Sequence, residues 1–404
     1  MKKSWLIACL LNFCVAALMG VLLRLAYLYP LGLNYTYLLH AHSHTVILGW
    51  CYLAVFGFVV YYFLSKEEQE KPVYNRLFWV TQLSVVGMML SFPFQGYAFF
   101  SIFFSTLHIL CSYYFCYRIL RNYQAASVVD GMMLRTALLF MVFSTAGVWC
   151  LGPVAASGAK DSDFYNLAIQ FFLHFQFNGW FLFATLGLFF NSLQKAGVAL
   201  AEATFQKFYW FALAGTFCTF FLPVSWYLPS FWVTWVNRSG LVLQLIALFY
   251  LIRLLFPHLK KIKVALHPIT KVLYGVAFSC LILKILMQSA TFFPEIAVAS
   301  HAIRNFTVGF IHLLMLGVVN SFLFAFIMQL PDFNAGHKTG TWGVRVFLGG
   351  FILMETCLFH QGFCVYTAGS IPHHYFVTIF LSSIVVLIGL LLLLLHILHP
   401  KKIA

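Results

Sequence analysis

The sequence predicts an all-α fold, a polytopic membrane bundle of about twelve transmembrane helices. Apolar residues make up 62% of the chain and charged residues only 8%, whereas about a quarter of a soluble domain is charged. The apolar runs are continuous, which excludes the alternating pattern of a membrane β-barrel. A soluble protein cannot bury this much apolar surface, so we expect residues 1–404 to form a single integral membrane domain in lipid.

The net charge of +14 does not indicate a nucleic-acid partner. The basic residues gather at the ends of apolar runs on alternate loops, which is how membrane topology is encoded. The side that carries most of them is expected to be cytoplasmic, with both termini there, and the lipid bilayer of a bacterial inner membrane is the expected surrounding. The basic residues on this side include Lys2, Lys3, Arg118, Arg121, Lys401 and Lys402.

The apolar runs place the helices in chain order. Each run is close to the length of about 20 residues that crosses the hydrocarbon core. The predicted helices cover residues 4–26, 38–64, 78–98, 99–120, 132–155, 164–192, 207–228, 238–256, 268–290, 303–328, 342–361 and 372–398.

The second predicted helix opens with three histidines, His40, His42 and His44. An imidazole in hydrocarbon is unfavourable without a partner, so this cluster is a functional-site hypothesis. His40 and His44 stand at i and i+4 on one helix face, a spacing that suits zinc or copper. The alternative is that both lie in the headgroup region and that the helix proper starts near His42.

Three further histidines, His108, His174 and His312, lie in the fourth, sixth and tenth predicted helices. At ~1.5 Å per residue, each lies ~14 Å below the outer surface. Two histidines from different helices can hold an iron porphyrin, one on each axial face. A lone histidine such as His108 more often bridges neighbouring helices, but His42 and His312 both stand in otherwise apolar segments, which favours a haem between them.

The sixth helix carries an alternating polar set, His174, Gln176 and Asn178. This set either supplies a third ligand or a cavity lining, or it forms hydrogen bonds between helices. The sequence leaves both alternatives open.

Charges within the predicted helices are few. Lys284 and Glu355 both lie in outer halves, where they pair with each other or flank a polar cavity. Arg304, at the outer start of the tenth helix, meets a haem propionate or anchors the interface. The sequence favours neither alternative.

Two segments resemble subunit I of the heme-copper oxidases, in particular the cbb-type branch with the nitric oxide reductases. His42-Ser43-His44-Thr45-Val46-Ile47-Leu48-Gly49-Trp50 is similar to the segment His-Thr-Asn-x-Val-Ile-Phe-Gly-Phe of the second family helix, and the resemblance implies that His42 binds the low-spin haem. The tenth family helix carries Gly-His-x-His-Leu. Residues 308–317 resemble it, with His312 as the other low-spin ligand and Phe310 in place of the catalytic haem ligand.

The resemblance also implies what this chain has lost. Residues 172–181 loosely resemble the sixth family helix, with His174 in the place of a copper ligand. The seventh helix of the family supplies Pro-His-His, but this chain has Leu222-Pro223-Val224-Ser225-Trp226-Tyr227. The expected protein therefore keeps a low-spin, bis-histidine haem b for electron transfer or small-gas handling, without copper, catalytic residues or terminal oxidase activity.

Two alternatives remain at this point. A haem–copper membrane protein of the nitric-oxide-response kind also has a His-Ala-His segment, here His40-Ala41-His42. A transporter without a cofactor would use histidines to relay protons, although no broken-helix pair or repeat of the halves supports it. The sequence does not decide between His40, His42 and His44 as the ligand. No C-x-x-C-H motif is present, so a haem c would belong to a cytochrome c-type or other redox partner subunit.

Overall fold

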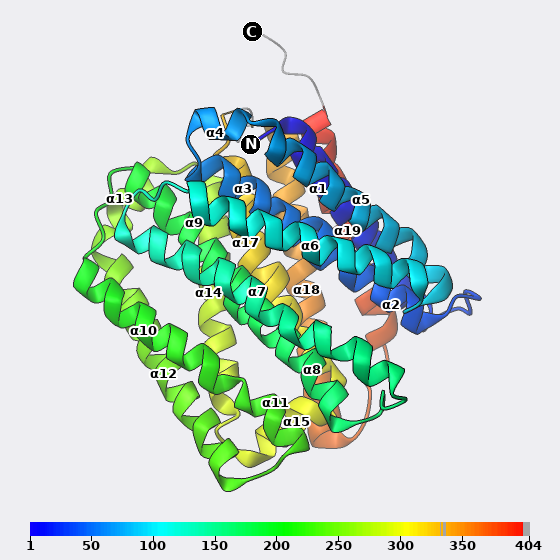
Figure 1. Ribbon diagram of the computed structural model, residues 1–404. Coiled ribbons are helices and arrows are strands. Elements are labelled where there is room, and N and C mark those ends of the chain that lie inside the picture. The colour runs from blue at the N-terminus through cyan, green and yellow to red at the C-terminus, as the bar shows by residue number, and fades with distance from the viewer. Residues whose placement is uncertain (332, 334–336, 399–404) are drawn as a thin grey trace. The chain divides into compact units, whose positions relative to one another are not determined.

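The computed structural model describes residues 1–331, 333 and 337–398, and every element in these ranges is helical (Figure 1). The predicted all-α membrane bundle is therefore confirmed. Lys401 and Lys402, which contributed to the predicted topology, lie outside the described residues.

Eleven helices of the described part of the chain are long and apolar enough to cross a membrane. The predicted span at residues 164–192 forms a continuous helix from Asp163 to Lys195, but it is not among these eleven. Its polar residues His174, Gln176 and Asn178 lower the mean hydropathy. The count of twelve spans stays a prediction.

The chain groups into two compact units. The first comprises Met1–Asn122, His267–Tyr274 and the described residues from Asn320 onward, and the second comprises Tyr123–Leu266 and Gly275–Val319. The single membrane domain expected from the sequence stays a prediction.

The first unit is built from long apolar helices with short polar caps. The Asn34 side chain accepts a hydrogen bond from the Tyr37 N–H at 3.1 Å and starts the second long helix, and Pro72 occupies the first turn of α5, where no N–H is needed. Its elements are α1 (Lys3–Leu25), α2 (Tyr35–His44), η1 (Thr45–Tyr52), α3 (Leu53–Phe63), α4 (Lys66–Glu70), α5 (Pro72–Gln95), α6 (Phe99–Asn122), α17 (Asn320–Met328), α18 (Lys338–Ala368) and α19 (Tyr375–Leu398).

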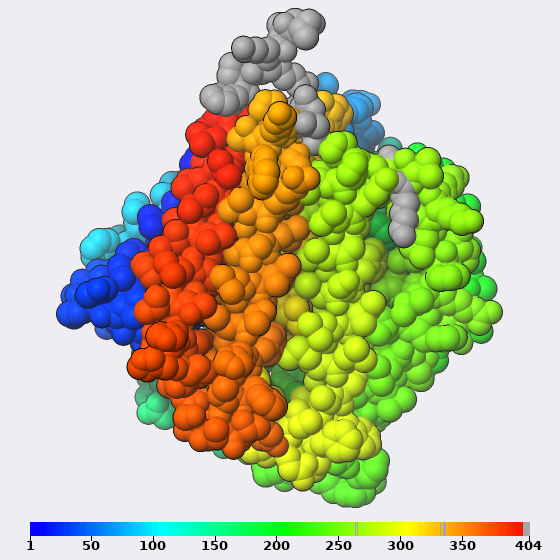
Figure 2. All heavy atoms as spheres, turned by 180° about the vertical axis from the view of Figure 1, so that it is seen from behind, coloured from blue at the N-terminus to red at the C-terminus, as the bar shows by residue number. Residues whose placement is uncertain are grey.

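The last two helices, α18 and α19, lie side by side (Figures 1 and 2). Gly389 permits this close approach, because a Cβ there would lie 2.4 Å from the Phe347 backbone nitrogen. The outward residues of α19 are apolar and exposed, and lipid is the surrounding that they suit. These residues include Leu381, Ile388, Leu391 and Leu395.

The second unit begins with a well-capped helix. Ser127 and Asp130 form a reciprocal capping box at the start of α7, and α10 and α12 run beside each other (Figure 1). Its elements are α7 (Val128–Ala156), α8 (Asp163–His174), η2 (Phe175–Phe181), α9 (Leu182–Lys195), α10 (Glu202–Thr219), α11 (Phe221–Tyr227), α12 (Phe231–Leu255), η3 (Phe256–His258), α13 (Leu259–Ala265), most of α14 (Pro268–Ala290), α15 (Pro294–Ala302), α16 (Arg304–His312) and η4 (Leu313–Val319).

Three elements, η1 in the first unit and η2 and η4 in the second, are π-helical segments inside otherwise α-helical spans. Each begins directly after a histidine, namely His44, His174 and His312, and each contains a glycine five residues beyond that histidine. π-helical turns are rare in proteins, and those that do occur often lie at functional sites. The wide turns therefore mark the same three helices on which the sequence places its candidate ligands.

Two of the glycines allow close packing beside these segments. A Cβ on Gly49 would lie 2.6 Å from Val85 Cγ1, and one on Gly179 would lie 2.5 Å from Phe140 Cγ. In the first unit the Asn12 amide also donates to the Gly49 carbonyl at 2.8 Å. This bond satisfies a backbone acceptor within a segment whose normal α-helical pairing is interrupted.

Candidate functional site

His42 lies on α2 with its ring held against α1. Its Nδ1 is 2.8 Å from the Ala16 carbonyl oxygen. A carbonyl can only accept, so Nδ1 carries the proton and Nε2 keeps its lone pair. A Cβ on Gly20 would lie 3.1 Å from His42 Cε1, so this glycine makes room for the ring. An imidazole fixed in this way, with one nitrogen bonded to a backbone carbonyl, is typical of a metal ligand.

The two flanking histidines have different surroundings. His44 Nδ1 donates to the His40 carbonyl at 2.9 Å, and His44 Nε2 lies 3.4 Å from the Tyr97 hydroxyl, so both ring nitrogens have contacts. His40 packs edge-on against the Tyr97 ring, with 4.7 Å between the ring centroids. Among the three histidines, this arrangement favours His42 as the ligand.

His174, the last residue of α8, has its Nε2 2.8 Å from the Thr216 carbonyl oxygen of α10. Nε2 therefore carries the proton and Nδ1 keeps the lone pair. The neighbouring Gln176 accepts a hydrogen bond from Ser144 of α7 at 2.8 Å, which is the interhelical alternative predicted for it. Asn178 differs, since its side chain lines a cavity.

This cavity lies within the second unit and has a volume of about 50 Å³. Its polar lining comes from four elements, η2, α10, α12 and α14, through Asn178, Thr216, Gln244 and Lys284. The side-chain oxygens of Asn178 and Gln244 are buried and have no hydrogen-bond partner among the described residues. Such acceptors in a small polar cavity are suited to bind ordered water.

Lys284 is the cation of this cavity. It is 1% exposed, and within the described ranges it makes no hydrogen bond or ion pair. Its Nζ lies 5.7 Å from the centroid of the Phe310 ring. Lys284 thus flanks a polar cavity, as one of the two sequence alternatives predicted. Its pairing with Glu355, which belongs to the other unit, stays a prediction.

The remaining predicted residues lie as follows. His312 is half-buried as the last residue of α16, directly before η4. Arg304 is exposed at the first position of α16. His108 is 3% exposed, and its ring packs edge-on against Tyr52, with 4.7 Å between centroids. His108 therefore fits the structural role expected of a lone membrane histidine.

Sequence reasoning missed Arg24, in the last turn of α1. It lies on α1 four residues after Gly20, the glycine against which the His42 ring packs. A signal was available, because Arg24 is a rare charge within an apolar run. The shared spacing of a histidine and a glycine in the three π-helical spans was also visible in the sequence.

The described geometry places the His42 ring against Ala16 and Gly20 of α1 in the first unit, and His174 and Phe310 share the second unit with the Lys284 cavity. The likeness to the heme-copper oxidases, predicted from short segments around His42, His174 and His312, stays a prediction. No family model and no curated protein matches the chain.

Proposed function

We propose that this protein is a membrane haem b protein that transfers electrons or handles a small gas, and that it resembles a heme-copper oxidase subunit I without its reaction centre. The observation that carries the proposal is the hydrogen bond from His42 Nδ1 to the Ala16 carbonyl, 2.8 Å long. It sets the tautomer and leaves Nε2 available for an axial bond to iron.

Two further features support this proposal. His42 and His312 would be the two ligands, and His312 directly precedes η4 while His42 lies three residues before η1. Arg24, in the last turn of α1, is the candidate counter-charge for a propionate in the first unit, and Arg304 is the corresponding candidate on the helix of His312. Bound haem b supplies a one-electron iron couple, whose potential depends on axial ligands and burial. The Ala16 carbonyl makes the imidazole more basic and fixes its orientation.

Three observations support the loss of the reaction centre. Phe310 stands where the resemblance places the catalytic haem ligand, and a phenyl ring cannot bind iron. The cation of Lys284 lies over that ring, 5.7 Å from its centroid. The α11 segment, Phe221–Tyr227, carries no histidine where the family has two copper ligands. We therefore propose no terminal oxidase activity, no copper centre and no catalytic residue.

The proposed setting is the inner membrane of a bacterium, with both termini in the cytoplasm. The basic residues at the helix ends support this orientation. Electrons would be exchanged with a cytochrome c-type or other redox partner subunit. A haem c would belong to that partner, because the chain has no motif for covalent haem attachment.

A proton-handling membrane protein without a cofactor is the second candidate. The observation that favours it is Lys284, a buried lysine that lines a cavity. Two amide oxygens there have no hydrogen-bond partner in the part of the chain that the structure describes. A water molecule there would accept a hydrogen bond from Lys284 and donate to Asn178 and Gln244. Ionisable residues in such places are typical of proton paths.

The test is a reduced-minus-oxidised optical spectrum of the protein purified after haem-supplemented expression, with iron and copper counted. We expect a six-coordinate haem b spectrum that is lost in His42→Ala and in His312→Ala. His44→Ala is the matched control, because this histidine lies on the same helix and has contacts at both ring nitrogens.

The outcomes separate the candidates. Wild-type protein without haem would refute the proposal and favour the proton-handling alternative. A spectrum lost in His44→Ala but kept in His42→Ala would refute the ligand assignment alone. Dioxygen or nitric oxide reduction at the rates of intact family members would show that the reaction centre is not lost.

A further inference from the structure

A groove on the first unit has no role in the proposed haem site. Its volume is about 580 Å³, and it lies between the start of α5 and the end of α6. Its lining combines basic, apolar and aromatic side chains. The lining residues are Lys71, Pro72, Val73, Arg76, Leu77, Val80, Tyr114 and Arg118.

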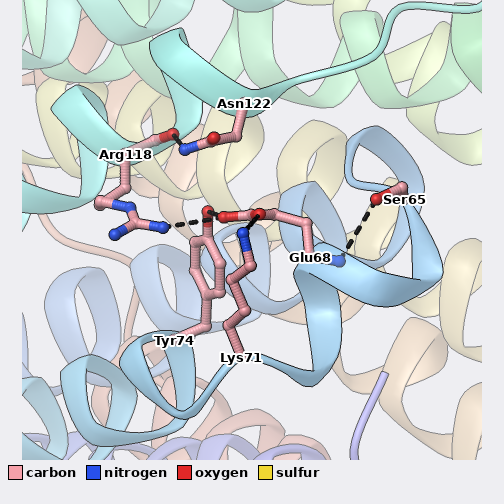
Figure 3. A network of polar contacts seen from close by, with 6 residues as sticks. All are labelled: Ser65, Glu68, Lys71, Tyr74, Arg118 and Asn122. Atoms are coloured by element: carbon pink, nitrogen blue, oxygen red, sulfur yellow. Dashed lines mark hydrogen bonds and ion pairs between the residues drawn. The ribbon is translucent and has the colours of Figure 1, made fainter.

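A buried carboxylate holds two of the cations in place (Figure 3). Glu68 of α4 accepts hydrogen bonds from Arg118 Nη2 and from the Tyr74 hydroxyl, each at 2.8 Å, and forms an ion pair with Lys71. The Ser65 side chain caps α4 by accepting from the Glu68 N–H at 3.2 Å. The cationic end of the groove is therefore ordered by the fold before any ligand arrives.

The third cation, Arg76, is not neutralised. It is exposed and makes no hydrogen bond or ion pair with any described residue. The lining thus carries three cations, of which Glu68 pairs with Lys71 and Arg118, so the lining keeps a net positive charge. An anionic group with several oxygens is the ligand that this charge suits, because guanidinium groups bind phosphate through two parallel hydrogen bonds.

The groove changes from charged to apolar along its length. On α5 the lining passes from Arg76 to Val80, which are four residues and about 6 Å apart. On α6 it passes from Arg118 to Tyr114 over the same spacing. Beyond them the surface of both helices stays apolar, with Leu83 58% and Leu110 53% exposed. A ligand that fills this groove has an anionic head and an apolar tail.

We infer that this groove binds one anionic phospholipid. Its phosphodiester lies between Arg76 and Arg118, and one acyl chain runs past Val80 along α5 toward the hydrocarbon core. Free phosphate would use only the cationic end and leave the apolar lining unused. The cations also lie on the side that the positive-inside rule assigns to the cytoplasm, where basic pockets between helices bind anionic headgroups.

The experiment is a lipid titration of the full-length protein in a zwitterionic detergent. Phosphatidylglycerol, phosphatidylcholine and inorganic phosphate are added separately, bound lipid is counted by native mass spectrometry, and the thermal unfolding midpoint is followed. Arg76→Gln removes one cation without breaking a described contact. Arg121→Gln is the matched control. Arg121 lies in the last turn of α6, the helix that also carries the lining residue Arg118, but it stacks on Tyr117 outside the lining, with 4.9 Å between its guanidinium carbon and the ring centroid.

We expect one phosphatidylglycerol per chain, bound in preference to phosphatidylcholine. Loss of one interfacial cation should weaken this binding about fivefold in Arg76→Gln and leave it unchanged in Arg121→Gln. Val80→Trp, which fills the apolar end, should also weaken the lipid but not inorganic phosphate.

Three results would overturn the inference. Equal losses in Arg76→Gln and Arg121→Gln would indicate general surface charge. Equal binding of phosphatidylcholine would remove the role of the anionic head. Full protection by inorganic phosphate, with no effect of Val80→Trp on phosphatidylglycerol, would indicate a free-anion site. None of these results depends on whether the protein binds haem.

Discussion

Replacing Glu68 by glutamine should destabilise the first unit by an amount that follows from its contacts. The Glu68 side chain is only 9% exposed, and that of Arg118 is 22% exposed. A hydrogen bond to a charged group contributes about 1.5–3 kcal/mol, so the Arg118 and Tyr74 bonds dominate. The Lys71 side chain is 49% exposed, and such an ion pair adds at most about 1 kcal/mol because solvent screens it.

Glutamine keeps the shape and one carbonyl oxygen but removes the charge. We expect Glu68→Gln to lower the free energy of unfolding by about 2 kcal/mol. Glu68→Ala should lower it by about 3–5 kcal/mol, since it leaves Arg118 partly buried without its carboxylate. Glu67→Gln, on the same short helix α4 but exposed, is the matched control and should change little.

The same carboxylate predicts a pH dependence. Burial raises the pKa of Glu68, but the hydrogen bonds from Lys71, Tyr74 and Arg118 outweigh burial and hold the pKa below its ordinary value of 4.5. A carboxyl with a lowered pKa in the folded state stabilises the protein above its unfolded pKa, and this stabilisation is lost as the pH falls through the folded pKa. The loss should therefore begin below pH 4.5 in wild type and be absent from Glu68→Gln.

The assay is denaturant or thermal unfolding in detergent, near neutral pH and at several values below pH 4.5. The difference between wild type and Glu68→Gln should shrink as the pH falls. A constant difference at every pH would refute the reasoning, because the stabilisation would then not arise from the carboxylate charge. So would an effect of Glu67→Gln as large as that of Glu68→Gln.

Three further substitutions test the packing and the buried polar groups. Gly49→Ala should destabilise by about 1–3 kcal/mol, because its Cβ would lie 2.6 Å from Val85 Cγ1; an unchanged unfolding midpoint would contradict this close packing. Asp130→Ala removes an acceptor that binds the Ser127 N–H and the Asn191 amide, both at 2.7 Å, and should destabilise by about 2–4 kcal/mol, measured by chemical denaturation against wild type. Lys284→Met removes a buried cation without a described counter-ion and should raise the unfolding midpoint; a lower midpoint would show that this lysine stabilises the fold.

Hydrophobic run length predicted the fold well, because lipid demands long apolar helices whatever their neighbours. The run at residues 268–290 coincides with α14 (Pro268–Ala290). The start of α5 was less predictable. It begins at Pro72 rather than at residue 78, since a polar first turn extends the helix beyond its apolar run. The short helix α15 carries no membrane-length signal and was not predicted.

The candidate site was less predictable, because its contacts join distant parts of the chain. Sequence offered His40, His42 and His44 as candidate ligands but could not reveal the acceptor of His42, the Ala16 backbone carbonyl, which any residue type could supply. Lys284 was recognised as a buried charge, whereas its neighbours Asn178 and Gln244 come from helices far apart in sequence. Hydropathy also cannot distinguish a π-helical turn from an α-helical one, so η1, η2 and η4 appeared only in the structure.

The three π-helical segments decide where each of these spans can lose a residue without redirecting its side chains. A π-helical turn accommodates one residue more than an α-helical turn. Deleting one residue within η1 would let the span return to a regular α-helix, with His42 and His44 keeping their orientation relative to α3. Deleting one residue in α3 would instead rotate everything before the deletion by about 100° relative to the rest of that helix. During divergence, a single-codon deletion would therefore leave these histidines in place when it falls within η1 and would redirect them when it falls beside it.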